Sequence, residues 1–500
     1  MSKYKASLYN YFFSSINNIV LIINGIIMVP LYLHFMPISV YGAWLASGNI
    51  VAMIGLLESG FSEIIIQKLS TSMSKEDELE FLTLSGSNLL TAGVISIGIL
   101  LFGLCFAPFM QTIVNIDSEF VRPVTIAYIL ALWSSALTIA TCLIGAFSQA
   151  WQETKPGGEI SFITNFLGIF AMIISLFCGL GVISLGVGYF VRATSNFCGL
   201  SIWTFRRWNE KKYKKPIYNY DNIKLLIKDC FYPFLSKLSN VIIGQSQSLI
   251  LAFFMNPTLA ALYDFTSKIV SCLCGFMSMA NSSFFAMFSI TYAKKDNEES
   301  NNTTNTVMQY YSICISAIII YSIFFSKTII TYWVGAEKFG GDLLLILIVL
   351  SLCINQFKMF LQNLLLSAGN FKQSSIIDIL SLIVYVSILA FCILKLQQYS
   401  IPISLGISSL IFCIIYLWLI KKQIKLNIYI IMQNIVKAFA ISVPFIIAYF
   451  IWGVDGYNLI RQILSFIIVS LTFISLTFIL NKEVYTKCFS LFKASWIVKK

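Results

Sequence analysis

The stretch that decides the fold runs from residue 9 to residue 69. Its first part, residues 9–33, reads YNYFFSSINNIVLIINGIIMVPLYL. A corner follows at His34-Phe35-Met36-Pro37, and residues 41–69 then read YGAWLASGNIVAMIGLLESGFSEIIIQKL. Each apolar part is at least as long as the ~20 residues that a helix needs to cross a bilayer. The sequence therefore predicts a hairpin of two membrane-spanning helices.

The same hairpin recurs later in the chain, at residues 236–293. With an offset of 219 residues and no gap, the matches include Gly25 with Gly244, Phe35 with Phe254, Met36 with Met255, Ile50 with Ile269, and Val51 with Val270. The second copy begins just after the longest basic loop. Two like halves that open with the same hairpin are typical of a two-lobed transporter.

Composition places the whole chain in the membrane. Hydrophobic residues make up 58% of it, charged residues only 11%, and the mean hydropathy is +0.82. Ordinary soluble domains carry roughly 25% charged residues. The apolar segments are continuous rather than alternating, which excludes a β-barrel. We therefore predict an all-α polytopic membrane protein.

The chain contains about fourteen segments of spanning length. We expect them at residues 8–33, 40–67, 81–110, 122–149, 159–180, 182–205, 226–255, 258–292, 307–334, 342–368, 373–395, 400–420, 428–452 and 459–481. Within the second segment, Ser59 and Gly60 weaken the helix and predict a hinge or a bend. The Asn-rich residues 297–305 are expected to form a solvated loop.

The predicted spans divide into two six-helix lobes and an appendix. Residues 1–205 form the N-terminal lobe, residues 206–225 a basic linker, and residues 226–421 the C-terminal lobe. Residues 422–500 then supply two additional helices and a basic tail. None of the loops is long enough to hold a soluble catalytic domain.

The formal charge of +12 is explained by topology rather than by a nucleic-acid partner. With both termini in the cytoplasm, most Lys and Arg fall on the cytoplasmic side, as the positive-inside rule requires. The cations expected outside are Arg122, Lys327, Lys338, Lys395 and Arg461. Inverting the chain would put the basic loops at 206–228 and 421–425 outside, so we predict a cytoplasmic N-terminus.

Most of the twelve cysteines stand singly in apolar segments, and the chain has one histidine. No His/Cys zinc set can be assembled from them, so we expect no metal site and no cofactor. No Gly-x-x-x-x-Gly-Lys-Ser/Thr phosphate loop is present. Nothing predicts a catalytic residue, and the protein is expected not to be an enzyme.

Four cations lie at membrane depth and need an explanation, because an ionisable group there costs several kcal/mol unless it faces protein or water. They are Arg192, Lys237, Lys268 and Lys358. We interpret them as the lining of a water-filled cavity for an anionic passenger such as a lipid diphosphate. Lys437 lies near enough to a helix end to reach the interface, and it is given no role.

The acidic residues at depth are Glu58, Glu63 and Asp264, which are candidates for coupling. Asp264 and Lys268 are four residues apart and can form an ion pair on one helix face instead. Glu58 could likewise neutralise Arg192. These alternatives remain open from the sequence.

Polar uncharged residues gather on the first and seventh segments, with Asn17 and Asn24 on one and Asn240 and Gln245 on the other. They either line the wet cavity or form hydrogen bonds between helices. Both interpretations place the two segments at the interior of the protein.

Three short stretches resemble the N-terminal signature of the Wzx-type polysaccharide flippases of the multidrug/oligosaccharidyl-lipid/polysaccharide (MOP) exporter superfamily. They are Pro30-Leu-Tyr-Leu-His34, Val40-Tyr-Gly-Ala-Trp44 and Leu56-Leu-Glu-Ser-Gly-Phe61. The similarity in length and span pattern extends over residues 1–420.

The resemblance implies two six-helix lobes arranged as a V around a central cavity. It implies transport of undecaprenyl-diphosphate-linked O-antigen units, for lipopolysaccharide biosynthesis, from the cytoplasmic to the periplasmic leaflet of the inner membrane. A capsular repeat unit is equally compatible, and polysaccharide polymerase machinery is a possible partner.

Two departures narrow the expected cargo. Lipid II flippases, which are relatives, carry several Arg in the first two spans, where this chain has none. Drug-extruding relatives often have an acidic residue in the first span, where this chain has Asn and Ser. The first departure argues against a peptidoglycan precursor as cargo, and the second makes a cation-coupled multidrug exporter the weaker, alternative function.

Overall fold

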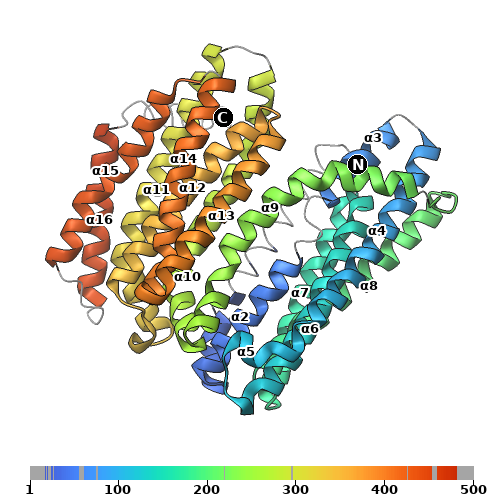
Figure 1. Cartoon of the computed structure of the whole chain (residues 1–500), viewed down its shortest axis with the longest axis horizontal. Helices are drawn as coiled ribbons and strands as arrows, with labels where there is room; N and C mark the ends of the chain where they lie inside the picture. Colours follow the sequence, from blue (N-terminus) through green and yellow to red (C-terminus); the bar gives the residue numbers. More distant parts are fainter. Residues whose placement is uncertain are drawn as a thin grey trace, which may run out of the picture. The chain divides into compact units, whose positions relative to one another are not determined.

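The computed structural model describes the chain from Asn17 to Leu480. Residues 18–19, 21–23, 26, 56–60, 75–76, 152, 219, 294–296, 425 and 453–458 are excepted. Every regular element in the described part is a helix (Figure 1). By their internal contacts the residues form two units, Met1–Ala261 and Leu262–Lys500. The all-α polytopic fold class is confirmed.

Unit 1 consists of a helical segment at residues 27–35 followed by a series of further helices. These are α2 (Ile38–Gly55), α3 (Phe61–Ser74), α4 (Glu78–Leu104), α5 (Met110–Val114), α6 (Ser118–Ala150), α7 (Thr154–Phe177), α8 (Ile183–Glu210) and α9 (Tyr220–Phe254). The helices α4, α6, α7 and α8 run side by side (Figure 1). α9 packs on α2, α3, α4 and α5.

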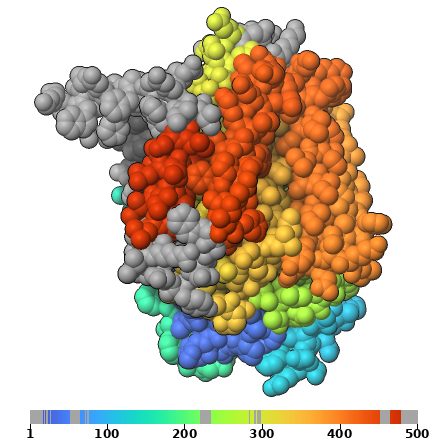
Figure 2. Space-filling view, turned by 90° about the vertical axis from the view of Figure 1, so that its left-hand side faces the viewer, coloured from blue at the N-terminus to red at the C-terminus, as the bar shows by residue number. Residues whose placement is uncertain are grey.

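Unit 2 holds the second series of helices. These are α10 (Pro257–Ala293, which begins just before the division), α11 (Asn297–Trp333), α12 (Asp342–Ser367), α13 (Phe371–Leu396), α14 (Ser400–Gln423), α15 (Ile428–Trp452) and α16 (Leu459–Leu480). α12 packs on α11, α13 and α14, and α15 packs on α11 and contacts α16. Figure 2 shows α15 and α16, in red, together at the surface of unit 2.

The hairpin repeat predicted from the sequence reappears in the helix ends. One helix ends at Phe35 and the next begins at Ile38, and 219 residues later α9 ends at Phe254 and α10 begins at Pro257. At the second corner, the Asn256 side chain accepts a hydrogen bond from Leu259 N at 2.8 Å, and Pro257 occupies the first helical position. Both residue types favour a helix start.

Glycine makes the tight turn between α7 and α8. Gly179 has φ +83°, a conformation that costs little only without a Cβ atom, and its N–H donates to Leu176 O at 3.1 Å. Leu180 N donates to Ser175 O at 3.2 Å, which completes a Schellman motif. The predicted break between the fifth and sixth spans is therefore present.

The outer surfaces are apolar, as a bilayer requires. Eight stretches of described residues are long and apolar enough to cross a membrane, and one of these, Phe371–Gln423, contains both α13 and α14. On α13, Phe391 and Leu394 are each 78% exposed. Exposed apolar surface on this scale marks contact with lipid.

The prediction of a loop at residues 297–305 is wrong, since α11 begins at Asn297. Glu298 and Glu299 lie in its first turn, where the helix dipole favours negative charge. Two of the Asn side chains bond to residues near the start of α15. Asn301 Oδ1 accepts a hydrogen bond from Asn427 N at 2.7 Å, and Asn434 Nδ2 donates to Asn305 Oδ1 at 2.9 Å.

The predicted lobes and linker were assigned by counting predicted spans, whereas the two units of the structure are defined by contacts between residues. The contact division falls between Ala261 and Leu262, one helix after the predicted linker at 206–225, because α9 packs within unit 1. The division into 1–205, 206–225, 226–421 and 422–500 stays a prediction. The expected bend at Ser59 and Gly60 lies outside the described residues.

Candidate functional site

Arg192 lies on α8, inside unit 1, and is partly exposed. Its guanidinium sits over the ring of Tyr189, 5.1 Å from the centroid, and Tyr189 packs on Trp44 at 5.8 Å. Within the described part of the chain, no carboxylate pairs with Arg192. Glu58, which could neutralise it, lies outside that part. Arg192 is thus a cation that the Tyr189 ring supports and that no described carboxylate neutralises.

Glycine lets α7 approach α8 closely at this position. A Cβ atom on Gly168 would lie 2.7 Å from Arg192 Cβ and 2.9 Å from Gly188 O. This close crossing restrains the Arg192 side chain at its Cβ atom, while the residue as a whole stays partly exposed. In the sequence, the glycines of α8 indicated that another helix approaches it closely.

The other candidate site residues in unit 1 differ in exposure and in hydrogen bonding. Lys237, on α9, is partly exposed. Asn240 Nδ2 donates to Ser236 O at 3.1 Å within the same helix, and Gln245 is exposed. Asn17 Oδ1 accepts a hydrogen bond from Asn165 Nδ2 of α7 at 3.0 Å, which is the interhelical bonding that the sequence left open. Asn24 Oδ1 is buried and has no hydrogen-bond partner in the described chain.

In unit 2, Lys268 and Asp264 form the ion pair that their spacing allows. Lys268 Nζ lies 3.6 Å from Asp264 Oδ2, one turn apart on α10. Their side chains remain 32% and 21% exposed. The pair therefore reduces the net charge of this face without sealing it.

Lys358 occupies a different environment, because it is only 1% exposed in the core of unit 2. It lies on α12 near Asp378 of α13, whose charge acts on it. Asp378 is also 1% exposed, and its oxygens accept hydrogen bonds from Gln362 Nε2 at 2.6 Å and Tyr416 OH at 2.9 Å. The structure places Lys358 in a closed polar core rather than on an open face.

Sequence reasoning missed Asp378, although a signal was available. α12 and α13 are antiparallel neighbours joined by a turn at Gly369, where φ is +84°. Lys358 and Asp378 stand at similar distances along the chain on either side of Gly369, so they lie at similar depth. Pairing charged residues across tight turns would have found the acid.

α12 also carries an internal row of amides that the sequence analysis did not single out. Gln356 Nε2 donates to Cys274 O and to Ser278 Oγ, both at 3.2 Å, and Tyr311 OH donates to Gln356 Oε1 at 3.1 Å. Asn363 Nδ2 donates to Asn281 O at 2.6 Å. These bonds join α10, α11 and α12 into one polar seam inside unit 2.

Glu63 lies on α3, but its side chain is outside the described residues, so two of the three coupling candidates have no geometry here. No group of three or more His, Cys, Asp or Glu side chains in the described part could hold a metal ion. The chemistry that these residues offer is charge and hydrogen bonding.

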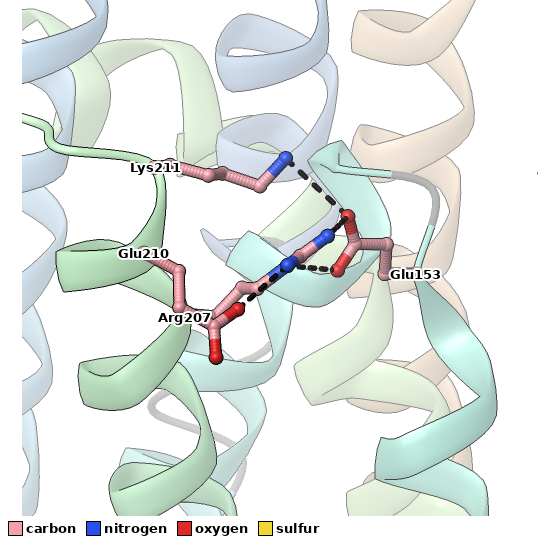
Figure 3. Close-up of polar contacts among 4 residues, drawn as sticks. All are labelled: Glu153, Arg207, Glu210 and Lys211. Atoms are coloured by element: carbon pink, nitrogen blue, oxygen red, sulfur yellow. Dashed lines mark hydrogen bonds and ion pairs between the residues drawn. The ribbon is translucent and has the colours of Figure 1, made fainter.

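A separate charged cluster lies where the α6–α7 turn meets the end of α8 (Figure 3). Glu153 accepts two hydrogen bonds of 2.6 Å from Arg207, through Nε and Nη2. Lys211 Nζ lies 3.3 Å from Glu153 Oε1, and Arg207 Nη1 donates to Glu210 Oε2 at 2.7 Å. The hydrogen bond from Arg207, the largest influence, holds the pKa of the Glu153 carboxyl below its ordinary value.

Comparison with known proteins assigns the family. The model of the family described as "Polysaccharide biosynthesis protein" matches residues 7–292. A search of curated proteins finds no match. The matched region covers the hairpin, the repeat and all of unit 1's long helices.

Solved structures of transporters share the fold. The lipid II flippase MurJ in an inward closed conformation aligns with TM-score 0.71 and 14% identity, over 94% of this chain and 99% of that one. An inward-facing multidrug resistance MATE family transporter of the MOP superfamily aligns with TM-score 0.62 and 13% identity, over 81% and 98%. An outward-facing multidrug resistance MATE family transporter of the MOP superfamily aligns with TM-score 0.57 and 13% identity, over 85% of this chain and 95% of that one. The predicted resemblance to this superfamily is confirmed.

Proposed function

We propose that this chain, which belongs to the polysaccharide biosynthesis protein family, is a flippase for lipid-linked oligosaccharides. Its cargo would be an undecaprenyl-diphosphate-linked O-antigen unit or a similar polysaccharide repeat. The unit would pass from the cytoplasmic to the periplasmic leaflet of a bacterial inner membrane. Transport would proceed by alternating access, without covalent chemistry.

Arg192 is the observation that carries the proposal. A guanidinium at membrane depth is costly unless it faces water, protein or an anion. Arg192 has an aromatic support and part of its surface accessible, and no described carboxylate neutralises it. Its planar fork suits two oxygens of a diphosphate.

Lys237 and Lys268 would add charge for the same headgroup. Both are partly exposed, and Asp264 would moderate the attraction of Lys268 so that the cargo can leave. Lys358 would act only if the core of unit 2 opened around it. Asn24, with its unsatisfied buried oxygen, is a candidate to bind a sugar hydroxyl.

The test is surface polysaccharide in a strain that lacks this chain. Re-expressed Arg192→Ala should restore about tenfold less polymer than the wild-type chain, since a charge-assisted pair contributes 1.5–3 kcal/mol. Arg192→Lys should restore an intermediate amount, because it keeps the charge and loses the fork. Arg122→Ala, an exposed arginine at the start of α6, is the matched control and should restore all of it.

Protein amounts in the membrane are compared by immunoblot. If Arg192→Ala restored wild-type polymer at equal protein amount, Arg192 would not be the headgroup site. If the strain without the chain already displayed full-length polymer, the flippase function itself would be wrong.

The MATE structures favour one alternative, a cation-coupled exporter of drugs or other small molecules. That function predicts higher drug sensitivity in the deletion strain with unchanged surface sugars. The flippase function predicts the reverse. Contact with a polysaccharide polymerase would follow only from the flippase function.

A further inference from the structure

The basic segment after α8 is an ordered loop. Lys212 adopts φ +54°, its N–H donates to Asn209 O at 3.0 Å, and Tyr213 N donates to Trp208 O at 3.4 Å. This is the Schellman motif, and the accompanying contact is present because the Trp208 and Tyr213 rings lie 5.2 Å apart. Trp208 Nε1 also donates to Lys214 O at 3.2 Å.

The loop is docked on α4. Tyr213 packs on Phe81 with ring centroids 5.0 Å apart, and Ile217 N donates to Leu82 O at 3.1 Å. The approach is close at Gly86, where a Cβ atom would lie 2.2 Å from Ile217 O. The loop therefore has a fixed position on unit 1.

Two carboxylates beside the loop are engaged in ion pairs, while Glu78 and Glu80 in the first turn of α4 are exposed and make none in the described chain. Glu153 and Glu210 both pair with Arg207, and Glu153 also pairs with Lys211 (Figure 3). Four further cations are exposed and make no ion pair in the described chain: Arg206 near the end of α8, and Lys212, Lys214 and Lys215 in the loop. The surface of the loop thus carries a clear excess of positive charge.

The level of the loop relative to the bilayer follows from the neighbouring spans. One span ends at Ala150 and the next begins at Thr154, so the turn between them marks the edge of the membrane. Trp151 in that turn stacks on Tyr213 at 6.2 Å and packs on Trp203 at 6.1 Å. Tryptophan and tyrosine gather at the headgroup level of membrane proteins.

Exposed apolar side chains accompany the cations. Phe205 is 68% exposed, Tyr218 62% and Ile217 43%. A soluble acidic partner would gain from the charge alone, whereas a lipid surface accommodates both the charge and the apolar groups. Several lysine point charges along one loop also suit a row of separate headgroups better than a single bidentate ligand.

We propose that Arg206, Lys212, Lys214 and Lys215 form a binding platform for the phosphate groups of anionic phospholipids in the adjacent leaflet. The platform is independent of the transported cargo: Arg206 lies about four turns beyond Arg192 on α8, and the three lysines follow the end of that helix. It would fix this end of unit 1 at the membrane surface.

The test titrates the purified full-length chain in neutral detergent with dioctanoyl phosphatidylglycerol and counts bound lipid by native mass spectrometry. Lys214→Gln/Lys215→Gln should bind about 30-fold more weakly, given the attraction of each basic residue to an anionic lipid surface. Lys421→Gln/Lys422→Gln, an exposed pair at the end of α14, removes equal charge and should bind as the wild type does. Dioctanoyl phosphatidylcholine should show no difference among the three proteins.

A second pair of variants moves the loop without changing any charge. Gly86→Ala meets Ile217 O and should weaken phosphatidylglycerol binding, whereas Gly93→Ala on the same helix meets nothing within 4 Å and should not. The proposal is overturned if Lys214→Gln/Lys215→Gln binds normally. It is also overturned if the Lys421/Lys422 control loses as much affinity, since net charge alone would then explain binding.

A third arm uses farnesyl diphosphate as the lipid. If Lys214→Gln/Lys215→Gln lost affinity for farnesyl diphosphate alone and kept phosphatidylglycerol, the loop would capture cargo, and the platform for membrane lipids would be wrong. Failure of the platform leaves the flippase assays unaffected, because those follow surface polymer and Arg192.

Discussion

Lys358 and Asp378 show what burial does to single charged residues in this protein. Gln362 and Tyr416 hold the oxygens of Asp378, and Lys358 supplies positive charge nearby in the same closed core. An isolated buried charge costs several kcal/mol, so we expect each of the two ions to be tolerated because the other is present.

This arrangement predicts a double-mutant result. Lys358→Met and Asp378→Asn should each destabilise the purified protein by about 3 kcal/mol, because each leaves an uncompensated buried charge. The double variant should recover most of that loss. Lys437→Met, a partly exposed lysine of α15, should change stability by less than about 0.5 kcal/mol. Unfolding in detergent measures all four, and near-neutral single variants would contradict the compensation.

The success of prediction from sequence differed among residues for a physical reason. The Asp264–Lys268 pair was predictable because i,i+4 spacing fixes it within one helix. Asp378 was missed because its relation to Lys358 depends on how two helices pack. Asn17 and Asn165 are 148 residues apart in sequence, and no local pattern predicts the hydrogen bond between them. Whether several cations line one cavity also depends on how distant helices pack, so it could not be predicted from local spacing.

At the scale of elements, helix existence and order were predictable and some helix ends were not. Apolar length fixed the spans, and Pro257 and Gly179 marked their corners. The start of α11 was misjudged because the asparagines of its first turns lie in a helix, and two of them, Asn301 and Asn305, bond to Asn427 and Asn434. Polarity alone does not separate a solvated loop from a polar helix contact.

The Glu153 clamp that joins the α6–α7 turn to α8 predicts a pH dependence. A carboxyl with a lowered pKa in the folded state stabilises the fold above its unfolded pKa, and this contribution is lost as pH falls through the folded pKa. The Tm of the wild-type protein should therefore fall below about pH 4.3. Glu153→Gln should lower the Tm at pH 7 by about 2–4 °C and flatten that acid limb.

Glu159→Gln provides the matched control, since Glu159 forms an exposed pair with Lys155 at 3.6 Å. Exposed pairs of this kind contribute little, so its Tm profile should follow the wild type. Fluorescence-monitored melting in detergent between pH 3 and 7 gives the comparison. An acid limb in Glu153→Gln as steep as in the wild type would show that other carboxyls control it.

At the scale of the whole molecule, composition and span length were sufficient for the fold class. The hydrophobic content and the hairpin repeat predicted a two-part helical transporter, and the MurJ and MATE structures share that fold. The contact division after Ala261 could not be predicted, because it depends on which helices α9 packs against. Span counting alone assigns α9 to the second half.

The orientation of the whole chain in the membrane is predicted from the distribution of its Lys and Arg residues. Excess Lys and Arg stay in the cytoplasm during insertion, so the loop after α8 should lie inside and the connection between α11 and α12 outside. Alkaline phosphatase, active only outside, should be active when fused after Lys338 and inactive after Lys215. Green fluorescent protein, fluorescent only inside, should give the opposite pattern, with fluorescence after Lys422 as well. Phosphatase activity after Lys215 together with fluorescence after Lys338 would invert the chain. The basic platform would then face the outer leaflet, and the proposed direction of transport would have no support from charge.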